Sequence, residues 1–192
     1  MAMKTTVCLV LDETGSMTTI RDQTISGYNE YKNGLKNVLF TLVKFNSSKV
    51  EMVHDGTPIK DVPDLTWETY TPSDLTPLYD AVGKTITGLK GKKGILVILT
   101  DGHENASVEY SQKQIFDMVT EIKEQGWQVV FLGADQDAWA ASQVMGIDRG
   151  STMSFAKGKA MQTFRALASA TKSSLNGEST DFWEDTDEED LG

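Results

Sequence analysis

The sequence predicts an α/β fold: a doubly wound, mostly parallel sheet with one antiparallel edge strand and helices on both faces. Three observations predict it. Segments 5–11, 94–100 and 127–132 are apolar or β-branched at nearly every position, which is typical of strands that are covered on both faces. Segments with a helical spacing of apolar residues alternate with these strands. Two further strand-like segments are separated only by a short turn, which indicates an antiparallel hairpin at a sheet edge.

The first half of the chain is predicted to hold three strands, a helix and a long loop. Apolar residues recur at helical spacing from Ile20 to Leu35, and Gly34 lies near the expected end of the helix. The loop contains three of the four prolines, and we expect Trp67 and Tyr70 to anchor it to the body. Long connections of this kind usually carry function. In chain order, the expected elements are a strand at 5–11, a helix at 20–35, hairpin strands at 38–45 and 49–54, and the loop at 55–74.

The second half continues the alternation of helices and strands. Segment 94–100 is the most strongly apolar strand and, like segment 5–11, ends at an aspartate. The amphipathic helix at 111–125 is closed by Gly126. Because crossovers between parallel strands are right-handed, we expect the helices to sandwich the sheet. The expected elements are helices at 78–89, 111–125, 135–145 and 156–173, and strands at 94–100, 127–132 and 152–155.

Charge divides the chain into two parts. The net charge is -10, but residues 176–192 contain eight acidic residues and no basic one, which leaves -2 for residues 1–175. We therefore expect one domain at 1–175 and an acidic, disordered tail at 176–192. The acidic balance argues against a nucleic-acid partner, because phosphate contacts require clustered Lys and Arg.

The sequence also predicts a soluble, cytoplasmic protein with no membrane partner. No segment approaches the run of about 18 apolar residues that a membrane helix needs. The residues from Met1 to Thr6 lead directly into a strand and do not resemble a signal sequence. The single cysteine, Cys8, lies in an apolar segment and is expected to be a buried, reduced thiol, which fits a reducing compartment.

Three polar segments fall at the ends of predicted strands or at the start of a helix. Residues 12–16 follow the first strand, residues 74–77 precede a helix, and residues 100–102 follow the central strand. In an open α/β sheet, ligands bind at the carboxyl ends of the strands. Gly15 is expected to let the first segment curl around a ligand. The segments offer two carboxylates and three hydroxyls, from Asp12, Thr14, Ser16, Thr76 and Asp101. Oxygen ligands of this kind suit Mg²⁺, with Mn²⁺ or Ca²⁺ as alternatives.

These segments resemble the three parts of the metal-ion-dependent adhesion site of von Willebrand factor A (vWA) domains. The matching residues occur in the family's order: Asp12-Glu13-Thr14-Gly15-Ser16-Met17, Thr76-Pro77-Leu78-Tyr79-Asp80-Ala81 and Leu99-Thr100-Asp101-Gly102. The resemblance covers about residues 4–148 and implies the doubly wound sheet described above. It extends to small stand-alone proteins of bacteria and their phages, some of which have a segment like 133–138 after the last long strand.

The resemblance implies a role for each residue of the set. Asp12, Thr14 and Ser16 would be first-loop positions, with Thr14 in place of the more usual serine. Thr76 would be the second-loop ligand, and Asp101 would bind the ion directly or through water. The implied function is a cation-dependent protein-binding module, not an enzyme, whose metal holds an Asp or Glu of a partner. Independently, a site with only two carboxylates is electron-poor and should accept an acidic sixth ligand.

Residues beside this set are assigned to the rim of the site or to the scaffold. We expect Glu13 to face solvent at the rim, together with His103 and Glu104. No second histidine lies at ligand spacing from His103, so a zinc site is not predicted. Asp80 is interpreted as a first-turn residue that interacts with the helix dipole, and Asn105 as a helix or turn cap.

A metal-dependent hydrolase or phosphatase is the first alternative function. Asp12 beside a metal could act as a nucleophile, as in haloacid-dehalogenase-like phosphatases. However, Thr14 stands where those enzymes carry a second aspartate, and no lysine is evident at a charge-stabilising position. The chain also lacks a glycine-rich phosphate loop that ends in Lys-Ser or Lys-Thr.

The second alternative is a scaffold or inhibitor that acts through the acidic tail. Phe182 and Trp183 lie among acidic residues and could anchor in a pocket of a partner, although a purely solubilising tail has the same composition. A carboxylate of the tail could instead bind the metal of a neighbouring copy, which would make the protein self-associating.

Overall fold

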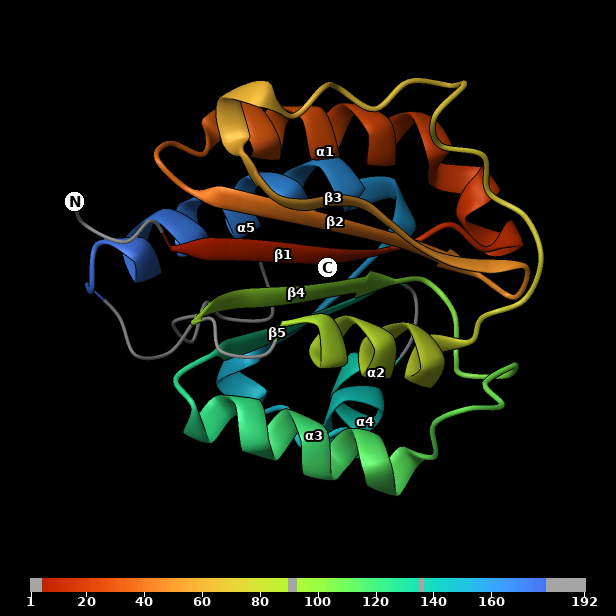
Figure 1. Ribbon diagram of the computed structural model, residues 1–192. Coiled ribbons are helices and arrows are strands. Elements are labelled where there is room, and N and C mark those ends of the chain that lie inside the picture. The colour runs from red at the N-terminus through yellow and green to blue at the C-terminus, as the bar shows by residue number, and fades with distance from the viewer. Residues whose placement is uncertain (1–4, 90–92, 135–136, 179–192) are drawn as a thin grey trace.

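The computed structural model describes residues 5–89, 93–134 and 137–178, and a six-stranded sheet lies at its centre (Figure 1). The strands lie in the order β3-β2-β1-β4-β5-β6. All neighbouring pairs are parallel except β2 and β3, which pair antiparallel at one edge. The predicted fold class is therefore confirmed. The strands are β1 Thr6–Asp12, β2 Leu39–Asn46, β3 Lys49–Pro58, β4 Gly94–Thr100, β5 Gln128–Ala134 and β6 Thr152–Phe155.

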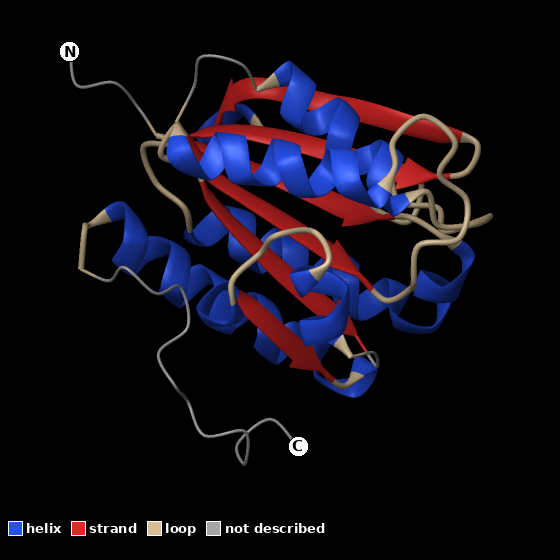
Figure 2. Ribbon diagram, turned by 90° about the horizontal axis from the view of Figure 1, so that it is seen from below, coloured by secondary structure: helices blue, strands red, loops and turns tan. Residues whose placement is uncertain are grey.

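Helices cover both faces of the sheet, as Figures 1 and 2 show. Two helices pack together over one face, two pack over the other, and a short helix lies beside β5 and β6. In that order they are α1 Arg21–Gly34 with α5 Ala160–Leu175, α2 Leu78–Gly88 with α3 Gln112–Glu124, and α4 Ala138–Gln143.

The central strands are buried on both faces, which explains their apolar sequences. Leu9 of β1 belongs to the core cluster that includes residues of α1 and α5, whereas the next residue, Val10, belongs to the cluster of α2 and α3. A strand between two cores needs apolar residues at every position. On the first face, α1 and α5 approach closely at Gly27, where a Cβ atom would lie only 2.3 Å from the ring of Phe164.

The edge strand β3 is longer than predicted. It continues past the expected end at residue 54 to Pro58, which pairs with Leu39 at the start of β2. The ladder is irregular around Leu42, and Gly56 adopts a φ of 58° that favours glycine. The prolines of this region suggested a loop here, but pairing with β2 resumes after the irregularity at Gly56 and continues the strand to Pro58.

The last helix also starts later than predicted. Residues 157–159 form a separate 3-10 turn after β6, and α5 begins only at Ala160. The predicted short helix at 135–145 is present as α4, and residues 135–136 lie outside the described residues.

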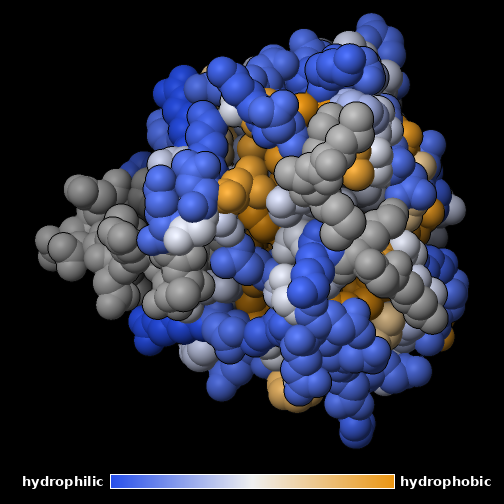
Figure 3. Space-filling view, turned by 60° about the vertical axis from the view of Figure 1, so that its left-hand side comes forward, coloured by the Kyte–Doolittle hydropathy of each residue, from blue (hydrophilic) through white to orange (hydrophobic). Residues whose placement is uncertain are grey.

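The strand order creates a switch point between β1 and β4. From this central pair the sheet is extended by β2 toward one edge and by β5 toward the other. Such a switch leaves a crevice at the carboxyl ends of the two strands. In Figure 1 these ends lie on the right, and they carry Asp12 and Asp101. The left-hand side, turned forward in Figure 3, is mainly hydrophilic, with apolar residues visible in recesses. Among the described residues, no helix is long and apolar enough to cross a membrane.

Candidate metal site

Asp12, the last residue of β1, is completely enclosed in the candidate site. Its Oδ1 accepts a hydrogen bond from the backbone N–H of Thr14 (2.7 Å), and its Oδ2 accepts one from the Thr100 hydroxyl (2.6 Å). The Tyr70 hydroxyl donates to the Asp12 carbonyl oxygen (2.6 Å). The first two donors fix the carboxyl group in place and the third holds the backbone, but all three are uncharged.

The electrostatics of the site show an excess of negative charge. Burial raises the pKa of Asp12 from its ordinary value of 3.8 to about 6. Hydrogen bonds from Thr100 and Thr14 offset part of this rise in pKa, whereas the charge of Asp101 adds to it. Burial, followed by the charges of the neighbouring carboxylates, also raises the pKa of Tyr70 well above its ordinary value. A bound cation would balance this excess charge.

Asp101 follows β4 and meets the first loop directly. The Ser16 hydroxyl donates to Asp101 Oδ1 (2.5 Å) and lies 3.3 Å from the Thr14 hydroxyl. Thr14 is buried whereas Ser16 is exposed, so the group opens to solvent on the Ser16 side. The structure thus joins three residues of the predicted set by hydrogen bonds, and Asp12 is linked to them through the backbone of Thr14.

Thr76, the fifth residue of the set, is held by the loop that follows β4. Its backbone N–H donates to Asn105 Oδ1 (2.8 Å), and its carbonyl oxygen accepts from the Asn105 N–H (3.1 Å). Its hydroxyl lies beside Gly102, where an added Cβ atom would be 2.9 Å from Thr76 Oγ1. A side chain at this glycine would therefore crowd the proposed ligand. The sequence interpretation treated Asn105 as a cap and missed its role in positioning Thr76.

The backbone of the first loop is tied to the long loop before α2. The Gly15 N–H donates to the Asp74 carbonyl oxygen (3.0 Å), and the Ser73 N–H donates to the Glu13 carbonyl oxygen (3.0 Å). Asp74 has a φ of 67°, in the left-handed region. Gly15 itself has no positive φ, so the prediction that it supplies unusual backbone freedom is wrong. A Cβ atom there would lie 3.4 Å from the Asp74 carbonyl oxygen, which is an ordinary van der Waals contact.

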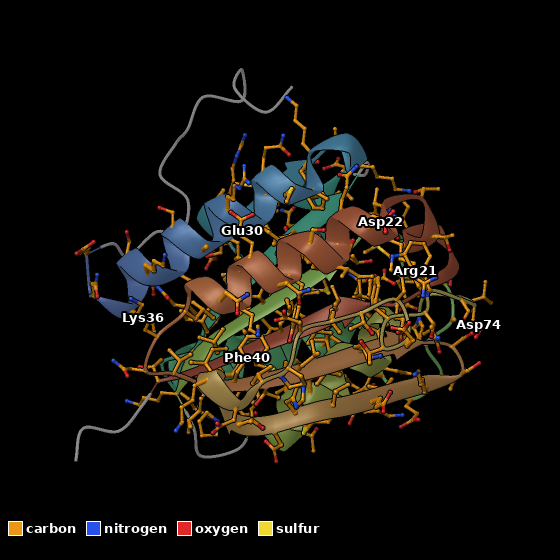
Figure 4. The ribbon with its side chains drawn as sticks, turned by 90° about the horizontal axis from the view of Figure 1, so that it is seen from above. Arg21, Asp22, Glu30, Lys36, Phe40 and Asp74 are labelled. Atoms are coloured by element: carbon orange, nitrogen blue, oxygen red, sulfur yellow. The ribbon has the colours of Figure 1, made fainter. Side chains whose placement is uncertain are left out.

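Tyr70 and Arg21 attach the long loop to the body. Arg21 Nε donates to the Tyr70 carbonyl oxygen (2.8 Å), and another guanidinium nitrogen donates to the Trp67 carbonyl oxygen. The guanidinium also lies 4.0 Å from the centre of the Trp67 ring. Figure 4 shows Arg21 and Asp74 at the same end of the molecule. Of the two expected anchors, Tyr70 is fully buried but Trp67 is 53% exposed and packs under the arginine.

Glu13 does not belong to the rim, contrary to the sequence prediction. Its side chain is fully buried, and Oε1 accepts hydrogen bonds from Lys44 Nζ (3.0 Å) and the Thr71 N–H (2.8 Å). Lys49 Nζ lies 3.4 Å from Oε2. Successive residues of an extended chain point to opposite sides, so Glu13 faces away from the site of Asp12 and meets the lysine of the neighbouring strand β2.

Two other acidic residues organise the loop after β4. Asp80, in the first turn of α2 as expected, accepts hydrogen bonds from the backbone N–H groups of residues 108–110. Both carboxylate oxygens of Glu104 accept hydrogen bonds, and its place at the rim stays a prediction. Its donors are Tyr79, Ala106 and Ser107. His103 is exposed, and its place at the rim stays a prediction.

A lysine that the sequence interpretation overlooked lies beside Asp101. Lys157 Nζ is 2.9 Å from Asp101 Oδ2, so the inference that no lysine is placed to stabilise charge was wrong. Lys157 is far from Asp101 in sequence, and the fold brings its turn against the turn at 15–20. Asp12 is nevertheless a poor nucleophile, because it is fully buried and both of its oxygens accept hydrogen bonds.

The residues fit a hard divalent cation. Asp101 Oδ2 is buried and makes no hydrogen bond, and hydroxyl oxygens gather beside Oδ1. Within the described ranges, no three His, Cys, Asp or Glu side chains form a metal-binding group. Hydroxyls and water would therefore complete the coordination around the two carboxylates, as Mg²⁺ permits because it retains several waters.

Solved structures share this architecture. The vWF domain of the type V pili tip protein Mfa5 from Porphyromonas gingivalis aligns with a TM-score of 0.69 and 10% identity, over 90% of this chain and 96% of that chain. The chain has the von Willebrand factor A fold. The ArnB paralog VWA2 from Sulfolobus acidocaldarius shares the vWA fold with a TM-score of 0.62 and 14% identity, over 87% of this chain and 46% of that chain.

Proximal thread matrix protein 1 from the mussel byssus aligns with a TM-score of 0.61 and 14% identity over 84% of this chain, which spans 46% of the mussel protein. That protein has also been solved with a zinc-occupied MIDAS motif, the metal-ion-dependent adhesion site, and this form aligns with a TM-score of 0.55. Comparisons of the sequence with protein-family models and with curated proteins find no match. At these identities the likeness shows the vWA fold alone.

Proposed function

We propose that this chain is a divalent-cation-dependent protein-binding module. The observation that carries the proposal is the pair of buried carboxylates at the switch point, which lies among hydroxyls and lacks a full set of counter-charges. The proposed ligands are Asp12, Thr14, Ser16, Thr76 and Asp101. Mg²⁺ is the first choice of ion, with Mn²⁺ or Ca²⁺ as alternatives. When bound, the ion supplies an open coordination position for an Asp or Glu carboxylate of a partner.

The loops around the site would select the partner. Leu75, next to Thr76, is 57% exposed, and Val108, on the loop after β4, is 89% exposed. An exposed apolar residue on each of two loops suits an acidic side chain that is flanked by apolar ones. His103 is the third exposed residue that we assign to this rim.

The remaining features extend this proposal. We assign the chain to the small stand-alone bacterial or phage type of vWA protein and to the cytoplasm, where the buried cysteine Cys8 would stay reduced. The resemblance and the enclosed, doubly hydrogen-bonded Asp12 favour a binding role over catalysis. The tail motif of Phe182 and Trp183 lies outside the described residues, and its part in self-association stays a prediction.

Binding of the metal is tested first, by calorimetric titration of Mg²⁺ into wild type, Asp101→Asn and Asp148→Asn. Asp148 pairs with Lys123 near the start of β6, at the opposite end of the sheet, and is the matched control. We expect wild type and Asp148→Asn to bind one Mg²⁺ and Asp101→Asn to bind none. Equal binding by all three proteins would place any metal elsewhere and overturn the proposed site.

Partner binding is tested next, by affinity capture from host lysate with the same three proteins. Partners held through the metal should be retained by wild type and Asp148→Asn in Mg²⁺, released by EDTA, and absent with Asp101→Asn. Partners retained in EDTA and by Asp101→Asn would show that binding uses another surface. Deleting residues 176–192 separates the tail from the site, because capture through the metal should survive that deletion.

A further inference from the structure

The turn between β6 and α5 carries a lysine whose ammonium group contacts Asp101, a proposed metal ligand. Lys157 Nζ lies 2.9 Å from Asp101 Oδ2, and the Lys157 side chain is 28% exposed whereas that of Asp101 has no exposed surface. The turn at 157–159 lies against the turn at 15–20, which carries Ser16. The ammonium group thus reaches the buried carboxylate from the solvent side of the site.

The two oxygens of Asp101 have different partners. Oδ1 accepts the hydrogen bond from Ser16, whereas Oδ2 makes no hydrogen bond within the described residues and faces the ammonium group of Lys157. A divalent ion held by Ser16 and Asp101 would share the same small volume with the ammonium group. Two cations this close repel each other strongly in a partly buried site, so the ammonium and the ion compete for the same negative charge.

We propose that Lys157 is a tethered counter-ion of the metal site: it neutralises Asp101 in the metal-free protein and must be displaced when a divalent cation binds. This inference rests on the proposed metal site. Its consequence is that Lys157 weakens metal affinity while it stabilises the metal-free fold. The opposite role, a lysine that positions Asp101 for the metal, would strengthen metal binding. The sign of the effect therefore decides between the two roles.

Calorimetric titration of Mg²⁺ into wild type, Lys157→Met and Lys123→Met tests the sign. Lys123 is a matched control, because it is 31% exposed, pairs with Asp148 at 2.6 Å, and lies at the opposite end of the sheet. We expect Lys157→Met to lower the Kd for Mg²⁺ by about fivefold to tenfold, from the loss of a partly buried competing charge, and Lys123→Met to leave it within about twofold. An unchanged or raised Kd in Lys157→Met would overturn the inference.

Thermal unfolding gives a second readout, which does not depend on the affinity measurement. In EDTA, Lys157→Met should melt below wild type because Asp101 loses its counter-charge, and saturating Mg²⁺ should raise its Tm by more than it raises that of wild type. Lys157→Arg keeps the charge and should keep the wild-type affinity. Equal Mg²⁺-induced shifts in Tm for wild type and Lys157→Met would contradict competition. Absence of Mg²⁺ binding by wild type and by every variant would instead overturn the proposed metal site itself.

Discussion

Asp12 and Glu13 are adjacent, acidic and fully buried, yet their surroundings differ completely. Glu13 meets the ammonium group of Lys44 at 3.0 Å, with Lys49 beyond it, and so its charge is neutralised within the protein. Asp12 accepts hydrogen bonds only from uncharged groups, and burial raises its pKa to about 6. A single step along the chain therefore separates a balanced carboxylate from an unbalanced one.

The difference shows how a functional site can be recognised in a fold. A buried charge that is paired and hydrogen-bonded serves the structure, because removing either partner leaves the other uncompensated. A buried charge without such a partner lowers stability and persists where a ligand supplies the balance. By this criterion Glu13 belongs to the scaffold that holds the long loop, and Asp12 belongs to the site.

The largest expected effect comes from removing the counter-charge of Glu13. Lys44→Met leaves a buried carboxylate without its main counter-charge and should lower the free energy of unfolding by about 3 kcal/mol. The loss should be the same in EDTA and in Mg²⁺, because this pair does not belong to the metal site. Urea denaturation under both conditions measures it.

Lys49→Met is the control for this prediction. Its ammonium group is 42% exposed and lies 3.4 Å from Glu13, so the variant should lose less than about 1 kcal/mol. A small loss in Lys44→Met, or one that appears only in EDTA, would contradict the division between scaffold and site.

The opposite change in stability is expected at Asp12. Asp12→Asn removes the unbalanced charge and should raise the free energy of unfolding in EDTA by between about 2 and 3 kcal/mol at pH 7, because the ionised form is disfavoured by roughly two pKa units in the fold. The same variant should lose the stabilisation by Mg²⁺. Asp80→Asn, which alters a carboxyl group that holds three backbone N–H groups, should instead be destabilised. Lower stability of Asp12→Asn in EDTA would show that the carboxylate is balanced after all.

The pH dependence of stability follows from the same raised pKa. The folded protein holds the Asp12 proton up to about pH 6, whereas the unfolded chain releases it near pH 3.8. The contribution of protonated Asp12 to stability is therefore complete below the unfolded pKa and is lost as the pH rises through the folded pKa. In EDTA, wild type and Asp12→Asn should be close in stability near pH 4, and a gap of between about 2 and 3 kcal/mol should open by pH 7. A gap that does not vary with pH would exclude the raised pKa as its cause.

Much of the fold and of the site could be predicted because their signals are local. Strands covered on both faces are continuously apolar, and the proposed ligands lie in three short segments at element ends, where parallel topology brings them together. The buried position of Glu13 could not be predicted, because its partner Lys44 lies on another strand. Lys44 pairs in register with Leu11, and only that register reveals the ion pair.

The role of Lys157 and the extension of β3 could not be predicted from the sequence for a similar reason. Nothing near Lys157 in sequence indicates a site, and the contact with Asp101 depends on the position of β6 at the far edge of the sheet. The end of β3 contains Gly56, which keeps a positive φ at an irregularity, and Pro58, and pairing with β2 continues the strand past both. Tertiary contacts, not propensity, decide both features.

Asn105 gives the smallest expected effect and tests whether positioning at the site can be separated from stability. Asn105→Ala removes one hydrogen bond from the Thr76 N–H in a partly exposed loop, so the free energy of unfolding should fall by only about 1 kcal/mol. Thr76 would lose its fixed position, and we expect the Kd for Mg²⁺ to rise by about threefold to tenfold. Ser107→Ala, in the same loop but bonded to Glu104 and to the Asp80 N–H, is the control and should leave the Kd unchanged at a similar loss of stability. If both variants weaken Mg²⁺ binding equally, the loop acts on the site as a whole, and Asn105 has no specific role in placing Thr76.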